Sequence, residues 1–396
     1  MTTSTALLTD RYELTMLAAA LRDGTASRPS VFELFSRRLS GGRRFGVVAG
    51  TGRLLTLLRE FRFGDDELRF LRDNDVVDAE SLTYLENYRF TGSIRGYREG
   101  ELYFPGSPIL TVEGSFADAV VLETLALSVL NHDSAVATAA SRMSIAAGER
   151  PLAEMGSRRA AEQSAVAAAR AAYIAGFRAT SNLEAGRRWG IPTMGTAAHS
   201  WTLLHETEEE AFRSQIDSLG TDTTLLVDTY DIRTGVETAI RVAGTGLGGV
   251  RIDSGDLPIV AAEVRAQLDE LGATGTRITV TSDLDEYAIA ALAASPVDAY
   301  GVGTSVVTGS GYPTASMVYK LVARQDPSGA WIGVAKASTD KASHGGRKAA
   351  FRTLVDGVAE AETVVVSDGF EELDTPAEHA DAVSYTHLRA HETKAN

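Results

Sequence analysis

The sequence predicts an α/β fold in which an irregular βα barrel is joined to a smaller α+β domain. From Phe177 onward, short β-rich runs alternate with helical runs, and polar residues follow nearly every candidate strand. Successive strands are separated by about 20–30 residues with one helix between them, which implies parallel pairing and right-handed crossovers. A barrel is favoured over an open sheet because the polar residues are not confined to one crossover point.

The chain has 396 residues, which exceeds the usual size of a single core, so we expect more than one domain. We assign residues 1–115 to an N-terminal α+β domain and residues 116–315 to the barrel. Residues 316–382 form a β-rich segment that we expect to rejoin the first domain. Residues 383–396 have no periodicity, and we interpret them as a non-native tail without functional meaning.

The elements of the first domain follow from local patterns. The expected order is a helix, a strand, a helix, a run of short strands with Gly/Pro turns, and two alanine-rich helices that lead into the barrel. Their ranges are Tyr12–Leu21, Val31–Phe35, Thr51–Phe61, Gly92–Val112, Ala117–Leu130 and Ala135–Ala147. Two further β-like runs, Met317–Ala323 and Trp331–Ala335, return after the barrel. The basic run Lys336–Lys348 is typical of a solvated face.

The barrel strands are short apolar runs, and we expect them at Gly176–Thr180, Thr193–Thr196, Thr224–Asp228, Gly249–Ile252, Arg277–Thr281 and Ala299–Val302. The helix between the fourth and fifth strands covers Leu257–Gly272, where apolar residues recur at helical spacing. Asp256 can cap its start. Asp283 and Glu286 have the spacing of a capping box and predict the start of the next helix.

Composition excludes several classes of protein. A formal charge of −15 argues against a general nucleic-acid binder, and no apolar run is long enough to cross a bilayer. The absence of cysteine excludes disulfides, thiolate metal sites and a cysteine nucleophile. The first twenty residues lack an apolar signal core, so we expect no secretory leader and a cytoplasmic location.

His199 lies in the motif Gly195–Trp201, directly after a predicted strand. A histidine at a strand exit can accept a phosphoryl group from ATP through a ring nitrogen, or act as an acid–base group. The structural alternative is a buried or capping histidine. The crowding of other polar motifs nearby favours a functional role.

Arg251 and Asp253 end the very hydrophobic strand at Gly249–Ile252. A sugar that carries a pyrophosphate needs a carboxylate for its hydroxyls and an arginine for its phosphate oxygens. Alternate residues of an extended segment point the same way, so these two side chains can share one pocket. Ser254 and Asp256 continue the same turn. A surface salt bridge is the less favoured alternative.

Two further motifs carry groups that bind anions. Gly303 and Thr304 follow the last barrel strand, where glycine lets backbone amides approach a phosphate and threonine adds a hydroxyl. Gly309–Gly311, which follows in the chain, either lines a second side of the pocket entrance or is a flexible turn. Arg158 and Arg159 follow a glycine, and we expect one to face the pocket and the other to face an acidic surface. Tyr12, taken alone, is expected in the core.

Six motifs taken together resemble nicotinate phosphoribosyltransferases of the type II phosphoribosyltransferase family. They are T-D-R-Y-E-L-T-M, E-M-G-S-R-R-A, G-F-R-A-T-S-N, G-T-A-A-H-S-W, G-V-R-I-D-S-G-D-L and G-V-G-T-S-V-V-T. The resemblance extends from Leu8 to Leu354. It implies synthesis of nicotinate mononucleotide and pyrophosphate from nicotinate and phosphoribosyl pyrophosphate in NAD biosynthesis. It also implies coupling to ATP hydrolysis through a phosphohistidine, with Mg²⁺ as cofactor, and a homodimer.

The resemblance also implies residue roles. His199 would carry the phosphoryl group, and Arg251 and Asp253, with Ser254 and Asp256, would hold the ribosyl phosphate. The remaining substrate-binding roles go to residues that bind the 5′-phosphate (Gly303, Thr304), line the nicotinate pocket (Met155, Arg158), read the ring carboxylate (Thr180, Ser181, Asn182) and stack on the ring from the neighbouring subunit (Tyr12).

Three alternatives stay open. A nicotinamide phosphoribosyltransferase would favour a buried acid in place of Thr180–Asn182, to accept a hydrogen bond from the amide. A quinolinate phosphoribosyltransferase would need more basic residues and no His199 motif. A non-catalytic barrel that binds sugar phosphates would leave His199 unexplained. The acidic run Ser282–Asp285 departs from many relatives, which have asparagine or glycine there.

Overall fold

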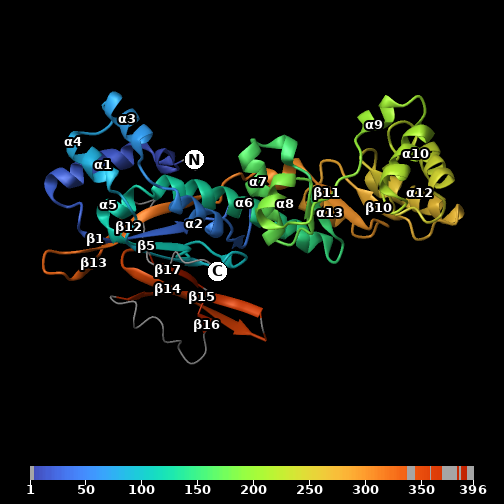
Figure 1. The fold of residues 1–396 in the computed structure, drawn as a ribbon. Coiled ribbons are helices and arrows are strands. Elements are labelled where there is room, and N and C mark those ends of the chain that lie inside the picture. The colour runs from blue at the N-terminus through green and yellow to red at the C-terminus, as the bar shows by residue number, and fades with distance from the viewer. Residues whose placement is uncertain (1–3, 337–343, 357, 368–380, 383–384, 390–396) are drawn as a thin grey trace. The chain divides into compact units, whose positions relative to one another are not determined.

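The computed structural model describes residues 4–336, 344–356, 358–367, 381–382 and 385–389. The chain divides into two compact units, Met1–Ser134 together with Thr314–Asn396, and Ala135–Pro313 (Figure 1). The sequence prediction had set the boundaries at 115/116 and 315/316. The first boundary falls within helix α6, Glu123–Ala147; the two expected alanine-rich helices are the short helix α5, Phe116–Val120, and this one continuous helix.

The unit Ala135–Pro313 is built on a parallel sheet that curls as a half-barrel, with the strand order β7-β6-β11-β10-β9-β8. The bounds are β6 Leu152–Glu154, β7 Ala179–Thr180, β8 Thr224–Leu226, β9 Gly249–Ile252, β10 Arg277–Val280 and β11 Ala299–Val302. Strand β6 was not anticipated. The expected strand at Thr193–Thr196 is absent from this described segment, where Thr193 makes only an isolated bridge to Thr180.

Helices connect these strands and follow them in the chain. They are η2 Ser157–Arg159, α7 Glu162–Ile174, α8 Leu183–Trp189, α9 His199–Leu204, α10 Glu208–Leu219, α11 Ile232–Ala243, α12 Leu257–Glu270, α13 Glu286–Ala291 and α14 Thr304–Val307. Asp256 occupies the N-cap position of α12, but its side chain makes no capping hydrogen bond. Helix α13 is capped by Asp285 rather than Asp283, because the Asp285 carboxylate accepts the Tyr287 and Ala288 N–H groups.

The other unit holds an antiparallel sheet with the order β13-β12-β1-β5-β3-β17. Its strands are β1 Pro29–Ser36, β3 Ser93–Tyr97, β5 Leu110–Ser115, β12 Met317–Gln325, β13 Trp331–Gly333 and β17 Tyr385–Arg389, and a small pair joins β2 Gly46–Val47 to β4 Leu102–Tyr103. Strand β12 pairs with β1 from Ser30 to Ser36, so the C-terminal segment returns to the N-terminal sheet. Of the suspected tail, only β17 lies within the described residues.

Helices and a C-terminal hairpin complete this unit. The helices are η1 Ala6–Leu8, α1 Arg11–Asp23, α2 Thr51–Arg59, α3 Asp65–Asp73 and α4 Ala79–Glu86, and the hairpin joins β14 Arg347–Val355 to β15 Val358–Ser367, with β16 Asp381–Ala382 beside β14. Lys348 was expected on a solvated face but is buried, and its Nζ donates to both carboxylate oxygens of Glu33 at 3.0 Å. Residues 337–343 of the basic run lie outside the described residues.

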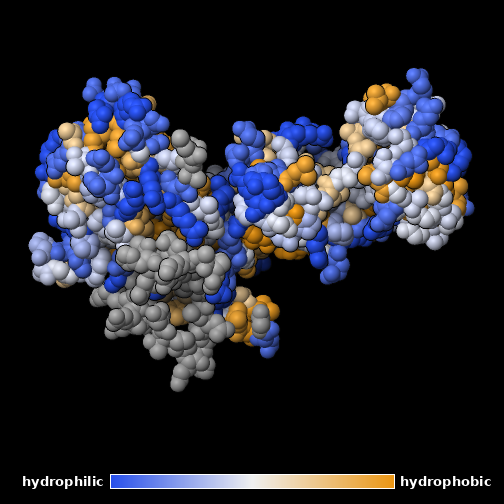
Figure 2. All heavy atoms as spheres, in the orientation of Figure 1, coloured by the Kyte–Doolittle hydropathy of each residue, from blue (hydrophilic) through white to orange (hydrophobic). Residues whose placement is uncertain are grey.

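Hydrophilic side chains dominate the face of the molecule in Figure 2, in keeping with the formal charge of −15. Large apolar side chains such as Leu34, Phe177 and Phe212 are buried beneath them. Among the described helices, none is long and apolar enough to cross a membrane.

Candidate active site

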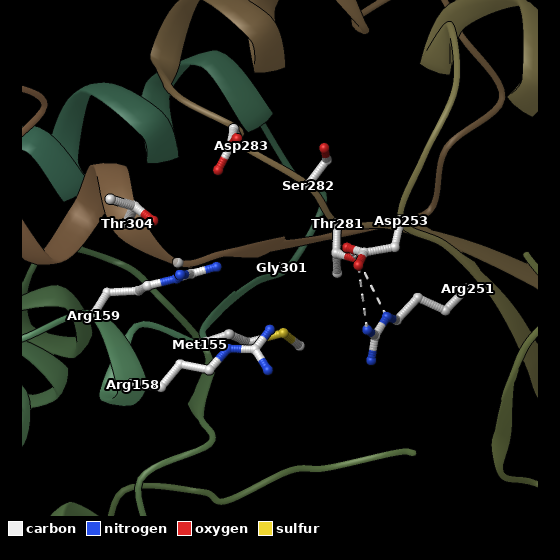
Figure 3. Close-up of a pocket in the computed structure, with 11 residues that line it drawn as sticks. Met155, Arg158, Arg159, Arg251, Asp253, Thr281, Ser282, Asp283, Gly301 and Thr304 are labelled. Carbon is white, nitrogen blue, oxygen red and sulfur yellow. Dashed lines mark hydrogen bonds and ion pairs between the residues drawn. The ribbon is translucent and has the colours of Figure 1, made fainter. Parts of the chain in front are cut away.

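A cavity of about 220 Å³ lies at the carboxyl ends of strands β6, β9, β10 and β11 (Figure 3). It is lined by Met155, Arg158, Arg159, Arg251, Asp253, Thr281, Ser282, Asp283, Gly301, Gly303 and Thr304. These residues lie at the carboxyl ends of strands or within five residues after them, which is where parallel α/β sheets bind ligands. Residues far apart in the sequence therefore meet on one rim.

Arg251 and Asp253 share this cavity, as their alternate spacing predicted. Arg251 Nε donates to Thr281 Oγ1 at 3.1 Å, and Thr281 Oγ1 donates to Asp253 Oδ1 at 2.5 Å. Arg251 Nη2 lies 4.0 Å from Asp253 Oδ2. Burial lowers the pKa of Arg251, and this effect outweighs the opposite effect of the nearby carboxylates. Thr281 was not identified from the sequence, and it fixes the two charged groups relative to each other.

Three guanidinium groups and two carboxylates line the cavity. The lining therefore has a net positive formal charge, although the whole protein is acidic. Arg158 and Arg159 both belong to the lining, so the expected split, with one arginine facing an acidic surface, was wrong. The short turn η2 explains this, because it carries both side chains past the end of β6. Such a cavity attracts a polyanionic ligand.

His199 is the first residue of α9, and its ring faces the turn after β9. Its Nδ1 lies 3.1 Å from the Thr229 hydroxyl. Its Nε2 lies 3.9 Å from Asp228 Oδ1 and 4.0 Å from Asp253 Oδ2. The imidazole and the Arg251–Asp256 turn thus converge, with Asp253 as the residue common to both groups.

Asp228 was not identified as a site residue from the sequence. It lies two residues after β8, and considering every polar residue that follows a strand would have identified it. Its side chain is 1% exposed. Oδ2 accepts the Asp253 N–H at 2.8 Å and the Ser254 hydroxyl at 2.7 Å. Oδ1 has no hydrogen-bond partner and lies 3.9 Å from His199 Nε2. Asp228 therefore fixes the turn with one oxygen and presents the other to the imidazole.

Thr180, Ser181 and Asn182 are not part of the cavity lining. They lie next to η2, the turn that carries Arg158 and Arg159, which we call the arginine turn. Thr180 Oγ1 donates to Glu154 Oε2 at 2.5 Å, and Asn182 Oδ1 accepts the Ala185 N–H that begins α8. Asn182 Nδ2 donates to Ser157 Oγ at 3.0 Å, which ties this segment to η2. The side chains of Thr180 and Asn182 therefore already have structural partners.

Glu154 is a buried carboxylate at the end of β6 that the sequence did not single out. Burial raises its pKa, against hydrogen bonds from Thr180 and the Gly156 N–H that lower it. Gly156, two residues further along the chain, is closely packed. A Cβ there would lie 2.2 Å from Val307 Cγ1 and 2.9 Å from the Gly303 carbonyl oxygen. Glycine there lets the arginine turn approach α14.

The remaining predicted residues have different surroundings. Ser254 and Asp256 are exposed on the turn and do not line the cavity. Gly303 and Thr304 line it at the start of α14. Tyr12 belongs to the other unit, on α1, and is 46% exposed, so the expectation of a core residue was wrong. Burial of its hydroxyl, with Glu123 and Glu13 nearby, raises the pKa of Tyr12 to about 12.

Comparisons with known proteins agree on one family. The family model described as nicotinate phosphoribosyltransferase (NAPRTase) N-terminal domain matches residues 7–131. Nicotinate phosphoribosyltransferase pncB1 of Mycobacterium tuberculosis is 61% identical over 354 residues, covering 87% of this chain and 78% of the relative. The Bacillus subtilis nicotinate phosphoribosyltransferase is 38% identical over 362 residues, covering 89% of this chain and 74% of the relative.

Solved structures give the same result. Human nicotinic acid phosphoribosyltransferase aligns with a TM-score of 0.76 and 27% identity, covering 96% of this chain and 86% of that chain. A nicotinate-nucleotide pyrophosphorylase from Pyrococcus furiosus aligns with a TM-score of 0.76 and 23% identity, covering 96% of this chain and 87% of that one, and it supports the fold alone. From the extent of identity to its relatives, the chain belongs to the nicotinate phosphoribosyltransferase family.

Proposed function

We propose that this chain joins nicotinate to phosphoribosyl pyrophosphate and releases nicotinate mononucleotide and pyrophosphate. One observation carries this proposal beyond family membership: a cavity with a positive balance holds Arg251 and Asp253 together, within reach of His199. The arginine suits phosphate oxygens and the carboxylate suits ribose hydroxyls.

The substrate can be placed by the chemistry of the lining. The 5′-phosphate fits at Gly303 and Thr304, where the backbone is open and a hydroxyl is available. The ribose hydroxyls fit against Asp253, and the pyrophosphate fits against Arg251. Nicotinate would then lie near Met155, with its carboxylate on Arg158. Because the Thr180 and Asn182 side chains are engaged elsewhere, Arg158 is the better candidate for reading that carboxylate.

In the transfer step, the nicotinate ring nitrogen attacks the anomeric carbon of the ribose. The bond from that carbon to the pyrophosphate oxygen breaks, and pyrophosphate leaves with the electron pair. Positive charge develops on the ribose ring, and Asp253 stabilises it electrostatically. Arg251 stabilises the leaving group. No side chain has to attack the sugar.

We also propose that His199 accepts the terminal phosphoryl group of ATP. Its Nε2 faces the carboxylates of Asp228 and Asp253, which favours a proton on that nitrogen and a lone pair on Nδ1. Nδ1 would attack the terminal phosphorus, and ADP would leave with the electron pair of the broken bond. Phosphorylation would favour a state that binds the substrates more tightly.

Mg²⁺ fits this cavity as an ion carried in by the substrate. Among the described residues there is no group of three or more acidic or histidine side chains that could hold a metal ion. Mg²⁺ prefers oxygen ligands and is often held by one or two carboxylates plus substrate phosphates. Asp253 and Asp283 are the lining carboxylates suited to this. The ion would supply charge neutralisation of the pyrophosphate.

The homodimer and the stacking of Tyr12 from a neighbouring subunit stay part of this proposal. Tyr12 is exposed on α1, so its ring is available for such a contact. The cytoplasmic location expected from the cysteine-free sequence also stays a prediction.

The test is product formation. Protein incubated with nicotinate and phosphoribosyl pyrophosphate should release nicotinate mononucleotide and pyrophosphate in equal amounts, and Asp253→Asn should raise KM for the sugar substrate while the fold is retained. Preferential turnover of nicotinamide or quinolinate would replace this proposal with another transferase. Binding of the sugar phosphate without any turnover would indicate a non-catalytic barrel.

A further inference from the structure

The turn Gly309–Gly311 follows α14, and its role was left open by the sequence. Gly309, Ser310 and Gly311 all have positive φ, at 63°, 51° and 81°. Glycine adopts this conformation freely, whereas a serine there is strained. A serine in this conformation directs attention to the contacts of its hydroxyl.

The hydroxyl of Ser310 is bonded to a buried carboxylate. Ser310 Oγ donates to Glu286 Oε2 at 2.7 Å, and Arg142 Nε donates to Glu286 Oε1 at 2.9 Å. Glu286 is 7% exposed, so both of its oxygens depend on these partners. Burial acts to raise the pKa of Glu286, but the hydrogen bonds from Ser310 and Arg142 hold it below its ordinary value. The lowered pKa favours the ionised carboxylate, so the hydrogen bond from Ser310 is charge-assisted.

This link joins two loops that line the cavity. Glu286 begins α13 directly after Thr281–Asp285, the loop that contributes Ser282 and Asp283 to the lining. Ser310 follows α14, whose first residue, Thr304, contributes from the other loop. Arg142, on helix α6, donates to Glu286 and so anchors the start of α13. Glu286, Ser310 and Arg142 themselves do not line the cavity.

We propose that Glu286 and Ser310 are positioning residues that hold the 281–285 and 303–311 loops at a fixed separation and thereby set the affinity for the phosphorylated sugar. The identity of that ligand rests on the proposed function. Breaking the link lets the loops move apart, so substrate binding weakens. The groups that act on the bound sugar, Asp253 and Arg251, keep their contacts with Thr281, because the Thr281 N–H is itself held by the Ile252 carbonyl oxygen of β9 at 2.9 Å.

Ser310→Gly is the most informative variant, because it removes the hydroxyl and also relieves the strain at φ 51°. We expect KM for phosphoribosyl pyrophosphate to rise roughly threefold to tenfold while kcat stays within about twofold, since the lost bond acts on binding. Ser310→Asn should restore part of the affinity, because asparagine tolerates this conformation and its amide can donate to Glu286.

Ser316→Gly is the matched control. Ser316 also has a positive φ, 57°, and its Oγ lies 3.5 Å from Ser40 Oγ. We expect wild-type KM and kcat for this variant. An unchanged KM in Ser310→Gly, or an equal rise in both serine variants, would overturn the proposal.

Hydrogen exchange of the ligand-free protein separates this inference from the proposed function. If the link positions both loops, Ser310→Gly should speed amide exchange in residues 281–285 as well as in residues 309–311. Faster exchange confined to residues 309–311 would contradict the link. If the wild-type protein forms no nicotinate mononucleotide, the proposed function fails, and the exchange result still decides whether the loops are coupled.

Discussion

Asp228 Oδ1 lies 3.9 Å from His199 Nε2, and the same carboxylate accepts the Asp253 N–H through its other oxygen. One buried side chain thus connects the imidazole to the turn that carries Arg251 and Asp253. A buried carboxylate beside a histidine fixes which ring nitrogen holds the proton. We therefore propose that Asp228 influences the tautomer of His199 and holds the turn that carries Asp253.

Asp228→Asn tests this relationship. The amide oxygen can still accept from Asp253 and Ser254, so the turn should be retained, but the amide N–H groups would face Nε2 and favour a proton on Nδ1. We expect labelling of His199 by ATP labelled in its terminal phosphate to fall by at least roughly tenfold. Asp231→Asn is the control, because Asp231 caps α11 and asparagine caps equally well. Equal labelling of Asp228→Asn and wild type would remove Asp228 from this role.

Arg158→Met tests recognition of the nicotinate carboxylate. Methionine keeps the apolar stem but removes the charge that would pair with the ring carboxylate. We expect wild type to prefer nicotinate over nicotinamide in kcat/KM, and the variant to lose roughly tenfold or more of that preference. Arg213→Met changes an exposed arginine on α10 and should leave the preference unchanged. A preserved preference in Arg158→Met would assign the carboxylate to another residue.

Gly156→Ala tests the close approach of the arginine turn to α14. The added Cβ would lie 2.2 Å from Val307 Cγ1, so the turn or the helix has to shift. We expect the free energy of unfolding to fall by roughly 1–3 kcal/mol and KM for the sugar substrate to rise, because Gly303 is displaced. Gly246→Ala meets no atom within 4 Å and should match wild type in both measurements. An unchanged free energy of unfolding in Gly156→Ala would show that the arginine turn and α14 leave enough space for a methyl group.

Glu13→Gln tests the pH dependence of stability. Burial raises the pKa of Glu13 from 4.5 to about 7, although Thr124 and Thr9 donate hydrogen bonds to its carboxyl group. Because the folded state keeps a proton that the unfolded state releases, this group makes wild-type stability fall as pH rises from 4.5 to about 7.

The measurement for Glu13→Gln is the thermal unfolding midpoint across that pH range. We expect a flatter pH profile for the variant than for wild type, since glutamine carries no titrating proton. Glu80→Gln, on the exposed side of α4, should reproduce the wild-type slope. Parallel profiles for wild type and Glu13→Gln would mean that Glu13 titrates normally.

Much of the barrel could be predicted from the sequence because its strands are short and apolar with polar residues at their ends. Strands β9 and β11 have the predicted bounds, and the period of two along β9 placed Arg251 and Asp253 on one side. Strand β6 was missed because three residues give no periodicity.

The parts of the site that were missed depend on tertiary contacts. The position of Asp228 just after a strand marks it as a candidate, but its importance comes from hydrogen bonds to residues 25 and 26 positions away along the chain. The resemblance implies a ligand role for Asn182, and the structure adds that its oxygen caps α8, a contact that its sequence neighbours did not indicate. The hydrogen bond from the Ser310 hydroxyl to Glu286 could not be predicted either, because the two residues come from different loops.

Centrally, we propose that the phosphoryl group taken up by His199 promotes the transfer step at the adjacent Arg251–Asp256 turn. Single-turnover formation of nicotinate mononucleotide, with and without ATP, in wild type and His199→Ala tests it most directly. We expect ATP to accelerate product formation in wild type and to have no effect in His199→Ala, which should retain the slower ATP-independent reaction. Equal acceleration by ATP in both proteins would contradict the claim.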